Sequence, residues 1–132
     1  MNEKEIEIRR LCGIVRTVAY EAHTYLKHGH MEKIYENSMV HRLRKLGVEV
    51  EHQFPIPVYD EDGFLLGDFF ADLFVENKLI VELKACRAIN DDHIAQLLGY
   101  LRSSRIEDGL LINFGAPRLF VKKFILTEEP RL

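Results

Sequence analysis

Three charged residues interrupt an otherwise apolar segment near the middle of the chain. Asp72, Glu82 and Lys84 lie in a stretch that is rich in leucine, isoleucine, valine and phenylalanine. Charged side chains inside strands are costly unless they are paired or bind a metal. Two carboxylates and one ammonium group at these spacings are the ingredients of a divalent-metal site that hydrolyses phosphodiester bonds.

The register of the hairpin that carries these charges can be counted from the sequence. A three-residue loop over residues 76–78 places Asp72 opposite Glu82 and turns both carboxylates and Lys84 to one face. A two-residue loop would turn Glu82 to the other side and bury charge, so the odd register is predicted. The other face then carries only apolar residues, which are Ala71, Leu73, Val75, Leu79, Val81 and Leu83.

A divalent cation would relieve the repulsion between the two carboxylates. Mg²⁺ is expected, with Mn²⁺ as an alternative, because a hard cation takes carboxylates, water and phosphate oxygens as ligands. Lys84 could then hold the attacking water or stabilise charge on the phosphate. The alternative is a surface ion pair between Glu82 and Lys84 beside a solvent-facing Asp72. The apolar neighbours Phe74 and Ile80 on the same face argue against that alternative.

Hydrophobic periodicity and turn residues predict the elements that must position these side chains. Asn90 is a good N-cap for a helix that follows the hairpin. The order ααβββαββ implies an α+β or α/β sandwich with a central mixed sheet. The expected helices cover residues 4–27, 31–46 and 90–103, and the expected strands cover 48–59, 64–67 (short), 68–75, 79–85, 109–114 and 118–126.

Length and composition set the general class of the protein. The chain has 132 residues, of which 47% are hydrophobic and 30% charged, so we expect one folded domain over residues 1–132. The net charge of −3 argues against a protein coated in positive charge, but it leaves room for a nuclease with a local basic rim. The sequence contains no apolar run that approaches the roughly 20 residues needed to span a bilayer, so we expect no membrane partner. The charged N-terminus and the free thiols expected at Cys12 and Cys86 make a cytoplasmic location the default expectation.

Two motifs give the chain a family resemblance. Asp72 followed by Glu82-Leu83-Lys84 resembles the signature of the PD-(D/E)XK nuclease superfamily, with Ala71 where a proline often precedes the aspartate. Residues 29–35 read G-x-x-E-x-x-Y and are similar to the small bacterial GxxExxY proteins, a branch of that superfamily. The resemblance spans roughly residues 10–126 and also draws on residues 54–59, 95–101 and 109–114.

The resemblance implies a restriction-endonuclease-like fold and Mg²⁺-dependent cleavage of phosphodiester bonds. The resemblance does not name a substrate, and we expect nucleic acid, with DNA favoured over RNA. It implies a metal site made by Glu32, Asp72, Glu82 and the carbonyl group of Leu83. It implies a catalytic set made by Asp72, Glu82, Lys84 and Gln96. Gln96 and Tyr100 match the Q-x-x-x-Y motif of RecB-like members, and Tyr35 and Tyr100 are expected in supporting positions.

Several of these assignments have plainer alternatives. By spacing alone, Glu32 is a first-turn carboxylate that stabilises a helix N-terminus, and Gln96 is an ordinary helix-surface residue. His93, Arg87 and Arg102 are candidate nucleic-acid contacts, and each can equally be a solvated polar group. A homodimer would extend the reach of so small a domain along duplex DNA. The competing hypothesis is a nucleic-acid-binding or protein-interaction module that keeps the fold without turnover.

Overall fold

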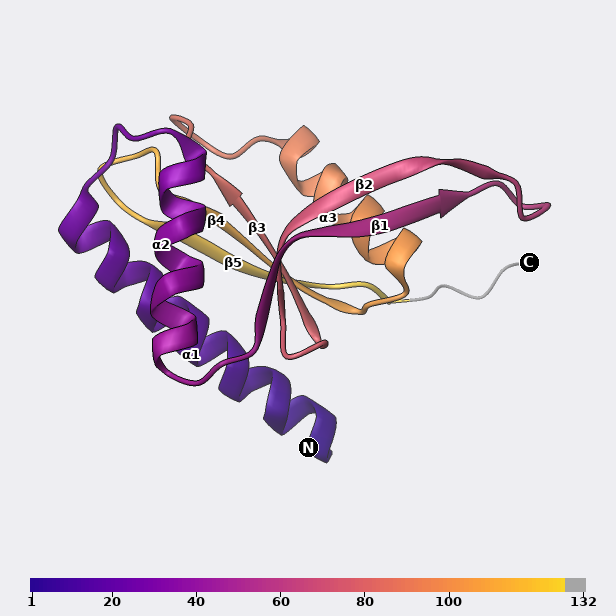
Figure 1. Ribbon diagram of the computed structural model, residues 1–132, viewed down its shortest axis with the longest axis horizontal. Coiled ribbons are helices and arrows are strands. Elements are labelled where there is room, and N and C mark those ends of the chain that lie inside the picture. The colour runs from indigo at the N-terminus through magenta and orange to yellow at the C-terminus, as the bar shows by residue number, and fades with distance from the viewer. Residues whose placement is uncertain (128–132) are drawn as a thin grey trace.

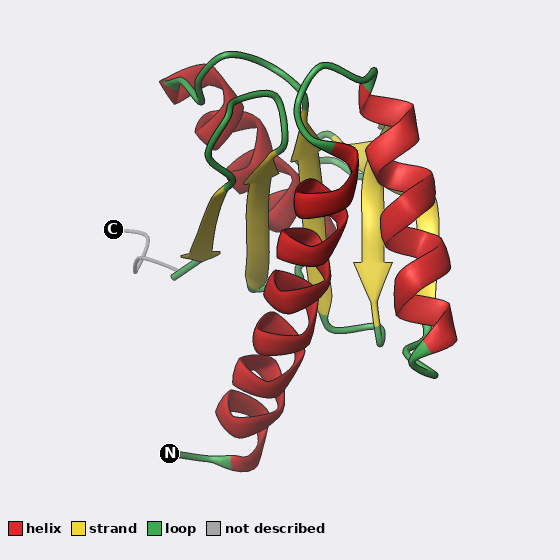
Figure 2. Cartoon of the chain, turned by 90° about the vertical axis from the view of Figure 1, so that its left-hand side faces the viewer, coloured by secondary structure: helices red, strands yellow, loops and turns green. Residues whose placement is uncertain are grey.

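The computed structural model describes residues 1–127 and places a five-stranded sheet between helices (Figures 1 and 2). The order of elements is ααβββαββ, so the predicted mixed sheet flanked by helices is confirmed. Residues 128–132 of the predicted domain lie outside the described part. The elements are α1 (Glu3–Leu26), α2 (Glu32–Lys45), β1 (Val50–Tyr59), β2 (Leu65–Val75), β3 (Leu79–Lys84), α3 (Asp91–Ser104), β4 (Asp108–Asn113) and β5 (Phe120–Ile125).

The strands follow one another across the sheet in the order β1-β2-β3-β4-β5. All neighbours are antiparallel except β3 and β4, which run parallel. That parallel pair needs a crossover, and α3 supplies it. The two strands expected at 64–67 and 68–75 form one continuous strand, β2, because it pairs along its whole length with β1.

Each face of the sheet packs against its own helices. Leu11 and Val15 of α1 and Met39 and Leu43 of α2 join one buried cluster with the strands. Leu97 and Leu101 of α3 join a second cluster on the other face. The sheet is therefore the middle layer of three, as Figure 2 shows.

β1 and β2 continue past the rest of the sheet as a two-stranded arm (Figure 1). Its turn is acidic, with Asp60, Glu61 and Asp62, and Phe64, Leu66 and Phe70 are exposed nearby. Within residues 1–127, no helix is long and apolar enough to cross a membrane.

The loop that follows β3 is fixed by β4 rather than left free. The side chain of Asn113 accepts the N–H groups of Cys86 (3.1 Å) and Gly115 (3.0 Å) and donates to the carbonyl group of Cys86 (2.9 Å). Gly115 approaches so closely that a Cβ there would lie 2.2 Å from the nitrogen of Cys86. These contacts hold the chain immediately after Lys84 and so constrain the end of β3.

Candidate metal-dependent site

The two hairpin carboxylates lie together at the point where β2 and β3 separate. The N–H of Asp72 donates to Glu82 Oε1 over 2.9 Å, and the N–H of Leu83 donates to Asp72 Oδ2 over 2.8 Å. These reciprocal bonds satisfy backbone donors that a regular ladder would otherwise pair. Both side chains are nearly inaccessible, with Asp72 8% and Glu82 4% exposed.

The hairpin has the register that was predicted. Val75 pairs with Leu79 and Leu73 with Val81, so the next position places Asp72 beside Glu82. The loop is able to form because Glu76 and Asn77 adopt φ values of 52° and 56°, in the left-handed region.

The predicted alternation of faces is confirmed at Leu73 and is wrong at Ala71, two residues earlier in β2. Ala71 packs in the α3-side cluster with Phe74 instead of with Leu73. On the neighbouring strand β1, His52 pairs with Leu73 and Phe54 with Ala71, and Gln53 lies between them. Gln53 has a φ of 51°, so the change of facing in β2 lies beside a left-handed residue in β1.

Burial makes the carboxylates hard to ionise while no cation is near them. Burial, and then the charge of Asp72, raise the pKa of Glu82 to about 9. Burial also raises the pKa of Asp72, although the N–H of Leu83 opposes the shift by bonding to the ionised form. The pKa of Glu32 is raised as well, first by partial burial and then by the charge of Asp72. The charge of Asp72 therefore opposes the ionisation of both Glu82 and Glu32.

Lys84 and Gln96 meet across the gap between β3 and α3. Lys84 Nζ donates to Gln96 Oε1 over 2.8 Å. Asn90 caps α3 with its side chain, so the helix begins where Gln96 can reach the end of β3. The bond fixes the direction of the ammonium group and leaves the amide nitrogen of Gln96 free for another partner.

Tyr100 lies one helical turn after Gln96 and is 7% exposed. Burial, followed by the charges of Glu82 and Asp72, raises its pKa to about 12. The phenol therefore stays protonated at neutral pH, within the field of the two carboxylates. Its ring also packs on Phe69 of β2, with the ring centroids 4.7 Å apart.

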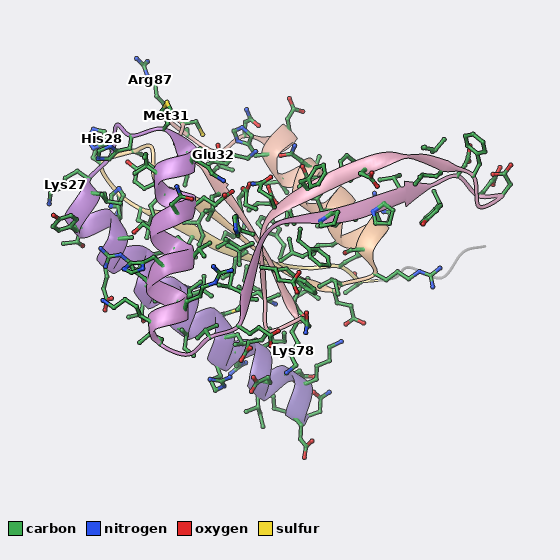
Figure 3. All side chains as sticks on the ribbon, in the orientation of Figure 1. Lys27, His28, Met31, Glu32, Lys78 and Arg87 are labelled. Carbon is green, nitrogen blue, oxygen red and sulfur yellow. The ribbon has the colours of Figure 1, made fainter. Side chains whose placement is uncertain are left out.

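Glu32 is the first residue of α2, and Figure 3 shows its position. The charges of Asp72 and Lys84 both act on its carboxylate. In the view of Figure 3, Arg87, from the loop after β3, and Met31 extend from the same end of the molecule as Glu32. Lys27 and His28, which follow α1, extend from the same end in that view. Contact of Arg87 with nucleic acid stays a prediction.

The other predicted residues lie farther from the carboxylates or are engaged elsewhere. Tyr35 is fully buried, and its hydroxyl donates to the carbonyl group of Lys27 (2.6 Å), so it braces the α1–α2 loop. His93 Nδ1 accepts the N–H of Asn90 (3.2 Å) and closes the α3 cap. Arg102 is exposed and lies six residues beyond Gln96, roughly 9 Å along α3. Contacts of His93 and Arg102 with nucleic acid stay predictions.

Two polar residues at the site escaped the sequence reading. Glu36, one turn after Glu32, is 3% exposed, although a glutamate on a helix ordinarily points to solvent. Gln53 donates to both Glu36 Oε1 and Asp72 Oδ1, the latter over 3.3 Å. The only sequence signal for either residue was their nearness to motif residues or to a strand edge.

The donor set suits a hard cation better than a transition metal. Within residues 1–127, no group of three or more His, Cys, Asp or Glu side chains is arranged to hold a metal ion. Asp72 and Glu82 nevertheless form a buried oxygen pair, and Mg²⁺ commonly takes one or two carboxylates together with water and phosphate oxygens. The carbonyl group of Leu83 follows Glu82 directly. The residues present therefore fit Mg²⁺ with an incomplete protein ligand set.

A basic cleft of about 530 Å³ lies between α2 and β1. Its polar lining includes His41, Arg44 and Lys45 from α2 and His52 from β1, and it contains no carboxylate. His52 Nδ1 lies 3.7 Å from Glu36 Oε2, so the cleft borders the polar groups next to Asp72.

Comparison with known proteins agrees with this geometry. A family model described as the PD-(D/E)XK nuclease superfamily matches residues 9–124. Among solved structures, the chain is similar to the crystal structure of SSO0001, with a TM-score of 0.57 and 17% identity over 74% of this chain and 50% of that one. The chain thus spans about half the length of that protein, and the likeness concerns the fold. A search of curated proteins gives no significant match.

Proposed function

The chain belongs to the PD-(D/E)XK nuclease superfamily, and from this premise we propose that it is a Mg²⁺-dependent nuclease that cleaves DNA. The observation that carries the proposal is the buried Asp72–Glu82 pair with Lys84 fixed beside it by Gln96. Two buried carboxylates that ionise poorly destabilise the fold on their own, and a bound cation would offset that cost.

In the proposed site, one or two Mg²⁺ ions would be held by Glu32, Asp72, Glu82 and the carbonyl group of Leu83. The ion would supply Lewis-acid polarisation of a phosphate oxygen. Lys84, aimed by Gln96, would orient the attacking water and offset the negative charge that develops on the phosphate. Tyr100 keeps its proton and can donate a hydrogen bond beside the carboxylates.

Asp72→Asn tests the metal site with little change of shape. The asparagine oxygen can still accept the N–H of Leu83, but the negative charge is lost. We expect Mn²⁺ binding to disappear in calorimetry, and cleavage of labelled DNA with Mg²⁺ to fall by at least about 100-fold. Asp68→Asn, at an exposed position of the same strand, is the matched control and should cleave like wild type.

Each outcome of that assay decides something. Full activity in Asp72→Asn would refute the mechanism. A wild-type protein that binds neither Mg²⁺ nor Mn²⁺ and cleaves nothing supports the inactive binding module instead. Cleavage of RNA but not of DNA, in parallel reactions, would overturn the assignment of the substrate.

We propose that the basic cleft holds phosphates of the bound strand. Arg44 lies twelve residues after Glu32 on α2, roughly 18 Å along the helix, which matches about five phosphates along one strand of a duplex. The acidic turn of the β1–β2 arm repels phosphate, so the cleft is the more favourable route away from the site. Arg87, in the loop after β3, would supply a further contact to the strand.

Replacing two charged residues of the basic cleft should weaken DNA binding and leave the rate of the cleavage step unchanged. We expect the double variant Arg44→Gln/Lys45→Gln to bind DNA several-fold more weakly and to lower the salt dependence of log K by about two phosphate contacts. Fluorescence anisotropy across a salt series, with Ca²⁺ replacing Mg²⁺, measures both. Lys122→Gln on β5, at the opposite edge of the sheet, is the control. An unchanged salt slope in the double variant would contradict the proposed path.

A further inference from the structure

The amide group of Gln53 joins two carboxylates that lie on different elements. Its Nε2 donates to Glu36 Oε1 on α2 and to Asp72 Oδ1 on β2. Because both partners are acceptors, the NH₂ end of the amide must point at them, and its two hydrogens serve one carboxylate each. Asp72 Oδ2 is occupied by the N–H of Leu83, so Gln53 completes the hold on this side chain.

Glu36 is a buried anchor for this bridge. Its side chain is enclosed yet accepts from Gln53, and Lys33 Nζ reaches Glu36 Oε2 over 2.6 Å from the helix surface. A carboxylate in such a place needs partners of this kind to offset its lost hydration. The chain Lys33–Glu36–Gln53–Asp72 therefore runs from the solvent edge of α2 to the centre of the site.

The backbone of Gln53 is bent to make the bridge. Its φ of 51° lies in the left-handed region, which is unfavourable for a residue other than glycine and unusual in the middle of a strand. The position lies between His52 and Phe54, whose partners Leu73 and Ala71 flank Asp72 on β2. Strained backbone of this kind concentrates at functional sites, where the strain serves the placement of a side chain.

We infer that Gln53 is a positioning residue for the metal site, holding Asp72 in its ligating orientation, and that Glu36 anchors Gln53. The inference rests on the proposed function, since it concerns the same metal. Outer partners of a metal ligand set its direction and typically change metal affinity 10–100-fold when they are removed. Glycine would adopt this positive φ without strain, and yet the position carries glutamine. The two contacts of the glutamine side chain explain this choice.

Gln53→Gly separates this role from a structural one. Glycine removes the bridge but adopts a positive φ without strain, so the relief of strain offsets much of the stability that is lost when Glu36 loses this partner, and the melting temperature should change little. Mn²⁺ affinity in calorimetry should nevertheless fall about tenfold. The Mg²⁺ concentration for half-maximal cleavage should rise by a similar factor, with the KM for DNA unchanged.

Two variants of Glu36 test the anchor, and one neighbour gives a control. Glu36→Gln keeps an oxygen that can accept from Gln53 and should retain most of the Mn²⁺ affinity, whereas Glu36→Ala should bind Mn²⁺ like Gln53→Gly. Glu51→Ala, at an exposed position two residues earlier in β1, should match wild type.

The outcomes distinguish this inference from the proposed function. Wild-type protein that binds no Mn²⁺ overturns the metal site and the positioning role with it. Wild-type binding together with unchanged affinity in Gln53→Gly overturns the positioning role alone. A fall in melting temperature without a change in affinity assigns Gln53 to stability and also overturns the inference.

Discussion

Lys84→Met is expected to lower the turnover number for Mg²⁺-dependent cleavage by about 10²–10³-fold, while Mn²⁺ affinity stays the same or increases. Methionine keeps the length of the side chain and loses the ammonium group that Gln96 holds at 2.8 Å. Loss of one fixed donor to charge that develops in the transition state has an effect of this size. The affinity for Mn²⁺ is expected to persist because the positive charge of Lys84, which acts on Glu82, repels a metal ion bound there. The substitution removes that repulsion.

The paired readout is what makes the Lys84 experiment decisive. Asp72→Asn should lose both metal and turnover, whereas Lys84→Met should lose turnover alone. Single-turnover cleavage at saturating Mg²⁺, together with Mn²⁺ calorimetry, measures the two effects on one preparation. Lys78→Met, in the turn of the same hairpin and far from Glu32 in Figure 3, is the control. Weaker Mn²⁺ binding in Lys84→Met would instead mean that the lysine supports the fold of the site.

The hairpin was predictable because one simple rule governs it. A strand pair with one apolar face allows only registers that keep charge off that face, and this fixed the odd loop before any coordinates. The hydrophobic periodicity of α1 and α2 and the N-cap at Asn90 are also local patterns, and they predicted the three helices. Together they were enough to give the order of elements and the sheet that the structure confirms.

The residues that the sequence did not reveal depend on contacts between distant elements. Glu36 reads as a surface glutamate until β1 covers it, and Gln53 reads as an ordinary strand residue until its φ is known. The contact between Lys84 and Gln96 joins a strand to a helix that begins seven residues later, and only the family motif suggested it. Spacing constrains neighbours on one element, and it is silent about side chains that meet across two.

Glu82→Gln is expected to stabilise the protein, increasingly so as the pH rises, while removing activity. Burial and then the charge of Asp72 raise the pKa of Glu82 from 4.5 to about 9 in the folded state. A carboxyl with a raised folded-state pKa favours folding fully below pH 4.5, and that contribution is lost as the pH rises towards 9. Glutamine does not titrate, and its oxygen can still accept the N–H of Asp72. We expect a gain in unfolding free energy of about 2–4 kcal/mol at pH 9 and little near pH 4.5.

Urea denaturation of wild type and Glu82→Gln between pH 5 and pH 9 measures the difference directly, with Glu51→Gln as the exposed control. A constant difference across that range would contradict the shifted titration of Glu82. Mg²⁺ should raise the stability of wild type at pH 8 and leave Glu82→Gln nearly unchanged, because a bound cation relieves the same buried charge that the substitution removes. The site would then be unstable in its own charged form and stabilised by its ion, as expected when selection has favoured a reactive site over a stable fold.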